Sequence, residues 1–184
     1  MAGYENRSRV HAPILGLAFA LALTACSEDL TAPPPIPIEE TEFANELGID
    51  LDQMTRLESG VYIQDVVEGE GLAVAEGDSV WVHYKLWLPD GFLVEDSRAG
   101  DNEEPVGLLF RPLPLGPLIP GWVEGVKGMR EGGTRKLVIP SQLGYGEYGV
   151  RGSRGDYIIP PNANLVFEVE LVQVKTPGGG EGEG

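Results

Sequence analysis

The sequence predicts an α+β domain in which a strongly bent antiparallel sheet of about five strands wraps around one short α-helix. The first observation is apolar–polar alternation, which is typical of strands with one packed face and one solvated face. Strands are predicted at 61–67, 79–88, 134–139 and 165–174. The second observation is that only 122–129 has convincing helical spacing. One short helix can cover the packed face only if the sheet bends around it.

Segment 79–88 is the most strictly alternating strand. Its packed face should carry Val80, Val82, Tyr84, Leu86 and Leu88. Its other face should carry Trp81, His83, Lys85 and Trp87. Asp90 and Gly91 follow, and this pair predicts a hairpin turn. The two tryptophans are either covered by residues 41–59 or exposed as a binding patch, and cover is the favoured interpretation.

Residues 41–59 form the least certain region. Phe43, Leu47, Leu51 and Met54 recur about every four residues, which predicts a weak amphipathic helix interrupted by Gly48. This segment either packs on the domain or belongs to a stalk. The sequence leaves both alternatives open.

Residues 1–25 are predicted to be a lipoprotein signal peptide. Basic residues precede an apolar run at 13–23, which is shorter than the roughly 20 residues of a spanning helix. The run ends in LTAC at 23–26, which resembles a bacterial lipobox, so Cys26, the only cysteine, is the predicted lipidation site. An ordinary cleavage site is the alternative. The predicted location is the bacterial cell envelope, lipid-anchored, with the domain on the periplasmic or extracellular side.

The predicted organisation continues with a lipid-anchored, proline-rich acidic linker at 26–59, which contains the short helix. The folded domain is expected at 60–175. Residues 176–184 consist only of Thr, Pro, Gly and Glu, and they are predicted to be a disordered tail.

Composition excludes several classes of function. The formal net charge of -16 argues against nucleic acid as a partner, because phosphates attract Lys and Arg. It also argues against electrostatic docking on anionic lipid, so membrane contact is expected only through the lipid anchor. His83 is the only histidine after residue 25, which leaves no material for a catalytic triad or a zinc site. Neither a metal nor a cofactor is expected.

The most informative stretch is 158–171, where two isoleucines run into Pro160 and Pro161. Proline fixes φ and lacks an N–H, so the isoleucines should lie at a rim and not inside a sheet. Segment 121–129 contributes a lone Trp122 at its start. Further motifs are VHY at 82–84, PDG at 89–91 and GYG at 144–146. Together these motifs resemble the FKBP-type peptidyl-prolyl cis-trans isomerases over residues 60–175.

The resemblance implies an FKBP-like fold and rotation about X–Pro peptide bonds. It implies proline-containing polypeptides as clients and macrolide inhibitors of the family as ligands. Catalytic roles then fall on Tyr84, Glu95, Asp96, Trp122, Tyr145 and Phe167. Substrate contacts fall on Val94, Leu113, Leu118, Ile119, Ile158 and Ile159.

The chain departs from the family pattern at two walls of the expected pocket. Val94 stands where the family has a phenylalanine, and the carboxylate is either Glu95 or Asp96. Leu113 is expected to replace a second ring. The loop 146–157 is longer than in the smallest members and carries aromatic and basic residues, so substrate selectivity is expected there.

The leading hypothesis is an exported, lipid-anchored prolyl isomerase that assists protein folding. It would act by desolvating a twisted X–Pro amide and donating hydrogen bonds to it. The alternative is a proline-peptide-binding module or holdase chaperone with weak or no isomerase activity, which the two altered walls favour. A purely structural envelope protein is the least favoured interpretation.

Overall fold

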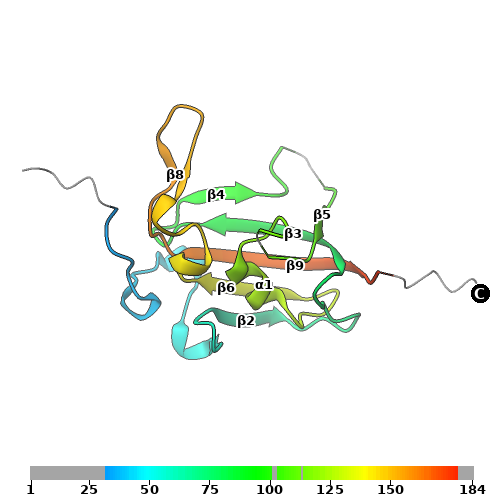
Figure 1. The fold of residues 1–184 in the computed structure, drawn as a ribbon. Coiled ribbons are helices and arrows are strands. Elements are labelled where there is room, and N and C mark those ends of the chain that lie inside the picture. The colour runs from blue at the N-terminus through cyan, green and yellow to red at the C-terminus, as the bar shows by residue number, and fades with distance from the viewer. Residues whose placement is uncertain (1–31, 101–102, 113, 178–184) are drawn as a thin grey trace, which may run out of the picture. The chain divides into compact units, whose positions relative to one another are not determined.

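The computed structural model describes residues 32–100, 103–112 and 114–177. Its centre is a seven-stranded antiparallel sheet in the order β1-β2-β6-β9-β3-β4, with β5 also paired to β3 (Figure 1). The strands are β1 (Thr55–Arg56), β2 (Tyr62–Val67), β3 (Ser79–Trp87), β4 (Leu93–Asp96), β5 (Val106–Leu109), β6 (Thr134–Ile139) and β9 (Leu165–Lys175). A separate hairpin joins β7 (Val150–Arg151) and β8 (Tyr157–Ile159). The bent sheet with one short helix confirms the predicted fold class.

The four predicted strands correspond to β2, β3, β6 and β9, and the Asp90–Gly91 turn joins β3 to β4. The sequence prediction missed the shorter strands. β4 and β5 both pair with the same edge of β3, β4 at 85–87 and β5 at 79–82. Four residues next to turn residues give too little alternation to identify a strand, so these two depend on the edge that β3 offers.

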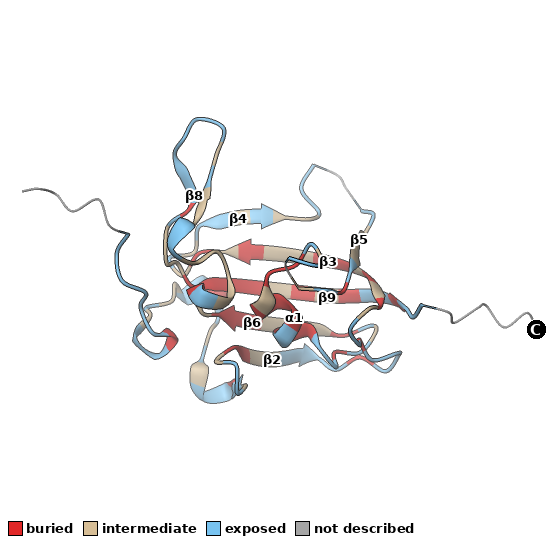
Figure 2. Ribbon diagram, in the orientation of Figure 1, coloured by how far each residue is buried: buried red, intermediate tan, exposed pale blue. Residues whose placement is uncertain are grey.

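The helix α1 (Pro120–Val126) lies against one face of the sheet, called the inner face here (Figure 1). Five of its seven residues are buried. A Cβ added to Gly121 would lie 2.2 Å from Ile139 Cγ2, and one added to Gly125 would lie 2.8 Å from Leu137 Cδ2. The two glycines therefore let the helix backbone approach β6 closely, and Figure 2 shows the buried residues gathered there.

A buried arginine holds the C-terminal end of α1. Arg135 on β6 donates through Nη1 to the Gly125 carbonyl at 2.9 Å. Its other nitrogens make two hydrogen bonds to the Asp65 carboxylate, at 2.7 and 2.9 Å. A cation suits the carbonyl end of a helix. A seven-residue helix is unstable alone, so these contacts and its packing hold it in place.

Residues 33–56 lie on the domain, which decides between the two alternatives left open above. The predicted amphipathic helix at 41–59 is wrong. Three short 3₁₀ turns and a strand replace it: η1 (Ile38–Glu40), η2 (Asn45–Leu47), η3 (Leu51–Gln53) and β1. Gly48 ends η2 with φ of 57°, a left-handed conformation that stops helical continuation. Consequently the predicted domain boundary at residue 60 falls between β1 and β2, although these two strands pair with each other.

This N-terminal segment covers part of the opposite, outer face of the sheet. Ile38 and Met54 are buried with Tyr62 and Val138, and Lys136 Nζ donates to the Leu47 carbonyl at 2.7 Å. The outer-face tryptophans are both half-buried. Trp87 shares a hollow with Glu46 and Leu47, whereas Trp81 lies against Gly107 of β5. Glu46 and Leu47 of residues 41–59 therefore lie around the same hollow as Trp87, and β5 lies beside Trp81.

Other predictions fall outside the described residues. They are the signal peptide, lipidation of Cys26, the wall residue Leu113 and most of the tail. Within residues 32–100, 103–112 and 114–177, no helix combines the length and apolar character needed to cross a bilayer.

Candidate active site

A cavity of about 190 Å³ lies at the inner face of the sheet beside α1. Five elements contribute to it: β3, β4, β5, β9 and α1, together with the loop before the helix and the loop after β6. The lining residues are Tyr84, Leu86, Glu95, Leu108, Pro117, Leu118, Ile119, Trp122, Tyr145 and Phe167. The cavity is thus largely aromatic and aliphatic, with one carboxylate.

Buried rings form the apolar part of the cavity. Trp122 is only 3% exposed, and its ring centroid lies 6.1 Å from that of Phe110 at a tilt of 57°. The Tyr84 and Phe167 centroids are 6.5 Å apart. Pro120 begins the helix, where its fixed φ and missing N–H are favourable, and Trp122 lies in the first turn. These rings are held rigidly by the core beneath them.

Two phenols and one carboxylate form the polar part. The Tyr84 hydroxyl donates to Glu95 Oε1 at 2.7 Å. Burial, then this hydrogen bond and the charge of Glu95, raise the pKa of Tyr84 above its ordinary value. Burial, followed by the charge of Glu95, also raises the pKa of Tyr145. Both side chains are therefore neutral phenols at physiological pH and can donate hydrogen bonds.

Two donors at the cavity are available to a ligand. Within the part of the chain that the structure describes, no group accepts a hydrogen bond from the Tyr145 hydroxyl. The N–H of Ile119 likewise has no acceptor among the described residues. Tyr84, in contrast, is committed to Glu95. The arrangement can hold a small apolar group against Trp122 while donating hydrogen bonds from the rim.

Seven of the predicted site residues line this one cavity. They are Tyr84, Glu95, Leu118, Ile119, Trp122, Tyr145 and Phe167. They come from positions 84 to 167 of the chain, so the fold and not the local sequence brings them together. Four other predicted residues in the described part of the chain do not line it.

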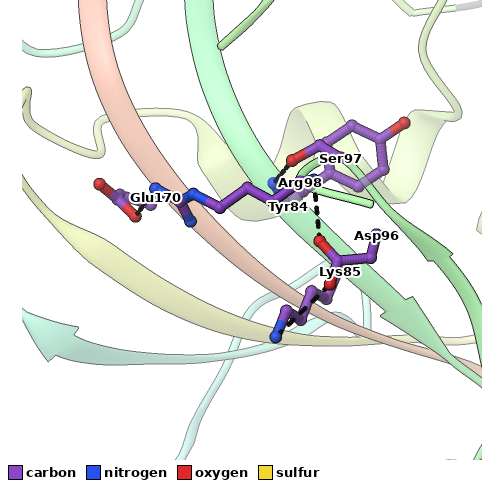
Figure 3. Close-up of polar contacts among 6 residues, drawn as sticks. All are labelled: Tyr84, Lys85, Asp96, Ser97, Arg98 and Glu170. Atoms are coloured by element: carbon purple, nitrogen blue, oxygen red, sulfur yellow. Dashed lines mark hydrogen bonds and ion pairs between the residues drawn. The ribbon is translucent and has the colours of Figure 1, made fainter. Parts of the chain in front are cut away.

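Asp96 is one of these four, and its predicted place in the pocket is wrong. Side chains alternate along β4, so Glu95 faces the cavity and Asp96 faces the other side. Asp96 approaches Lys85 Nζ at 3.6 Å and accepts the Arg98 N–H at 2.9 Å. Figure 3 shows these contacts beside the ion pair that Arg98 makes with Glu170 on β9. The choice between the two carboxylates is therefore decided in favour of Glu95.

The other three residues flank the cavity without lining it. Val94 is half-buried and packs against the core where β4 shifts register against β3. Ile159 is 3% exposed within the core, whereas Ile158 is 41% exposed. Strand alternation in β8 accounts for this pair, because neighbouring side chains must point to opposite sides. The structure does not place the predicted lip of two isoleucines in the cavity.

The sequence prediction missed three lining residues, Leu86, Leu108 and Pro117. Leu86 could have been found, since it shares the alternating face of β3 with Tyr84. Leu108 belongs to β5, which the alternation pattern did not reveal. It supplies an aliphatic wall of the kind that was predicted for Leu113.

The β7–β8 hairpin projects from the domain near β4 (Figure 1). Arg151 stiffens it, because its guanidinium carbon lies 3.9 Å from the Tyr157 ring centroid. Arg151 also donates to the Tyr157 hydroxyl at 2.6 Å and to the Gly155 carbonyl at 2.7 Å. Tyr148, at the base, is 79% exposed. The hairpin thus presents aromatic surface to solvent on a braced backbone.

Comparisons with known proteins agree with this geometry. The sequence pattern of the family described as FKBP-type peptidyl-prolyl cis-trans isomerase matches residues 71–172. The chain is 44% identical over 115 residues to an FK506-binding protein of Neisseria meningitidis serogroup B, covering 62% of this chain and 96% of that protein. It is 42% identical over 134 residues to the isomerase FkpA of Escherichia coli K12, covering 73% of this chain and 43% of that protein.

A solved structure is similar as well. The crystal structure of FkpA from Escherichia coli matches with a TM-score of 0.57 and 36% identity, over 72% of this chain and 55% of that chain. The likeness therefore extends from sequence to fold, and it spans the strands, helix and loops that line the cavity. This chain belongs to the FKBP-type peptidyl-prolyl cis-trans isomerase family.

Proposed function

We propose that the cavity beside α1 isomerises X–Pro peptide bonds of client polypeptides and so assists protein folding. The observation that carries the proposal is the combination of a buried ring floor with two unengaged donors, the Tyr145 hydroxyl and the Ile119 N–H. Such a site suits a proline ring that rests on Trp122 with its peptide carbonyls at the rim.

The chemistry needs no nucleophile. Rotation about a peptide bond crosses a barrier of about 18–20 kcal/mol, because the twisted amide loses its resonance. Water solvates the planar, more polar amide better than the twisted one. A dry cavity removes that preference, and fixed donors that fit the twisted geometry lower the barrier further. Trp122, Phe167 and Leu108 exclude water in this proposal, and Tyr145 and Ile119 donate.

Glu95 has a supporting role. It accepts the hydrogen bond of the Tyr84 hydroxyl and so fixes the ring in position, where it serves as a wall of the cavity. Because the Tyr84 hydroxyl donates to Glu95, it does not donate a hydrogen bond to the substrate. Substrate selectivity is proposed for the β7–β8 hairpin, which projects near β4 (Figure 1) and offers the exposed Tyr148 at its base and the braced Tyr157 as contacts for a client chain.

The test is the cis–trans isomerisation rate of a proline tetrapeptide with the full chain added. Uncatalysed isomerisation takes tens to hundreds of seconds at 25 °C, so acceleration is readily measured. A rate equal to the uncatalysed one, from protein with a cooperative unfolding transition, would overturn the proposal. Binding of the peptide without acceleration would favour the second candidate, a peptide-binding module. The aliphatic wall at Leu108 is the observation that supports that candidate.

We also propose that Cys26 is lipidated and anchors the domain at the cell envelope. The supporting observation is the LTAC motif at 23–26, which contains the only cysteine of the sequence. Farther along the chain, the Pro33 carbonyl accepts a hydrogen bond from Asn162 Nδ2 at 2.6 Å. Cys26 lies seven positions before Pro33, a stretch that can span at most about 25 Å when extended. The anchor would therefore hold the domain close to the membrane, because residues 33–56 lie on the domain and add no length to the tether. Wild-type protein that partitions into the aqueous phase of a detergent extraction, as Cys26→Ala should, would contradict the anchor.

A further inference from the structure

Two asparagines in the turn between β8 and β9 join segments that are far apart in the sequence. Asn162 and Asn164 each bond both to residues 33–41, called the strap here, and to the loop 141–146, called the Tyr145 loop. Asn162 has φ of 59° and is the only residue other than glycine with positive φ in the described part of the chain. Asn164 is 4% exposed. Such a strained position and such a buried amide each require specific partners.

On one side, the asparagines hold both ends of the Tyr145 loop. The Asn162 N–H donates to the Gly146 carbonyl at 2.7 Å. Asn164 Oδ1 accepts the Ser141 N–H at 3.0 Å. Tyr145 itself has φ of -100° and ψ of 0°, in the sparsely populated bridge region. A backbone in that region persists only where its surroundings hold it in place, and these two hydrogen bonds hold the ends of the loop.

On the other side, the side-chain amides of the same two asparagines hold the strap. Asn162 Nδ2 donates to the Pro33 carbonyl at 2.6 Å. Asn164 Nδ2 donates to the Ile36 carbonyl and to Thr41 Oγ1, both at 2.8 Å. Prolines in the strap have no N–H to donate, and their extended backbone presents carbonyls outward. Amide donors from the domain are therefore the natural partners for this segment.

The strap has other anchors, and these lie away from the Tyr145 loop. Ile38 is buried in the outer-face cluster, and Glu39 accepts a hydrogen bond from the Tyr62 hydroxyl at 2.7 Å. Loosening the strap there leaves both asparagines in contact with the loop. The chain thus offers two kinds of strap anchor, of which only the asparagines contact the loop that carries Tyr145.

We propose that Asn162 and Asn164 are positioning residues, through which the docked strap fixes the direction of the Tyr145 hydroxyl into the cavity. The inference rests on the proposed function, since it assigns Tyr145 to the isomerase reaction. The strap then has a part in activity although it touches no substrate. A lipid anchor attached seven residues before Pro33 would act on this same contact.

The experiment is a double-mutant cycle on kcat/KM for a proline tetrapeptide, in the full chain. Asn162→Gly keeps the left-handed backbone and its N–H and removes only the amide side chain. Asn164→Asp keeps the acceptor for Ser141 and places an oxygen opposite the Ile36 carbonyl. Tyr145→Phe should lower kcat/KM about two- to tenfold, the range of one neutral hydrogen bond. Each asparagine variant should also lower kcat/KM, by no more than this factor.

The decisive comparison is the asparagine variants in the Tyr145→Phe background. There they should cause no further loss, because the hydroxyl that they position is gone. Independent sites would instead give multiplying losses. Tyr62→Phe is the matched control. It removes a strap hydrogen bond away from the loop and should leave kcat/KM unchanged.

Two results would overturn the inference separately from the proposed function. One is an active enzyme in which Tyr145→Phe lowers kcat/KM and the asparagine losses multiply with it. The other is an asparagine variant with wild-type kcat/KM. Absence of any acceleration by the wild-type chain would instead overturn the proposed function, and this inference with it. Unfolding transitions of all variants show whether each is folded at the assay temperature.

Discussion

The two faces of the sheet are covered in different ways. On the inner face, α1 lies so close to β6 that a Cβ at residue 121 or 125 would come within 2.8 Å of a β6 side chain, and Trp122 is almost fully buried. On the outer face, the cover is a proline-containing segment with three 3₁₀ turns, held by a small apolar cluster and by side chain–carbonyl hydrogen bonds. The inner cover is a packed core that leaves one cavity at its edge. The outer cover is an extended segment docked on the sheet, and its separate hydrogen bonds can each be removed by one substitution.

Replacement of a tryptophan on each face should give the largest contrast. Trp122→Ala removes a buried ring and should cost about 3–5 kcal/mol of unfolding free energy, with loss of isomerisation. Trp87→Ala, at a half-buried outer-face position, should cost less and leave activity intact. Denaturant unfolding and the tetrapeptide assay measure both. Equal losses for the two variants would contradict the contrast between the faces.

A single methyl group tests the close approach on the inner face. Gly121→Ala places a Cβ 2.2 Å from Ile139 Cγ2, and overpacking of this kind costs roughly 1–3 kcal/mol. Alanine is otherwise the better helix former, so a stabilised variant would show that α1 can move away from β6 freely. The unfolding midpoint in denaturant, at unchanged slope, is the measurement.

The aliphatic walls of the cavity can be made aromatic. Leu108→Phe places a ring on the cavity lining and should raise kcat/KM, by about two- to tenfold if the ring contributes the 0.5–1.5 kcal/mol of an aromatic pair. Val94→Phe is the matched control, because Val94 packs beside the cavity without lining it. It should change kcat/KM less. A larger gain in kcat/KM from Val94→Phe would show that the aromatic side chain is more effective on β4 than on β5.

The smallest expected effect is on tyrosine titration. The raised pKa of Tyr84 means that its contribution to stability is fully present below pH 10 and is lost as pH rises through the folded-state value. Glu95→Gln removes a charge that raises the pKa of both Tyr84 and Tyr145. Their ionisation, followed by ultraviolet absorbance, should then occur at lower pH. Unchanged titration would show that burial alone is responsible.

The sequence was most informative where a single element carries its own pattern. Strand alternation identified β2, β3, β6 and β9, and spacing identified α1 within about three residues at its end. Short motifs were enough to identify the family and seven of the cavity residues. These features are local: each depends on residues within one strand, helix or turn, and their physical cause acts within a few residues.

The tertiary structure alone decided the rest. It assigned the carboxylate to Glu95, since the register of β4 on β3 sets which side chain faces the cavity. It placed Leu108 in the wall and Ile158 in solvent, because β5 and β8 form only against neighbouring strands. It also placed the proline-rich segment on the domain, where Asn162 and Asn164 meet its carbonyls. Hydrogen bonds between residues more than 120 positions apart leave no periodic trace in a sequence, because nothing local distinguishes a docked strap from a free linker.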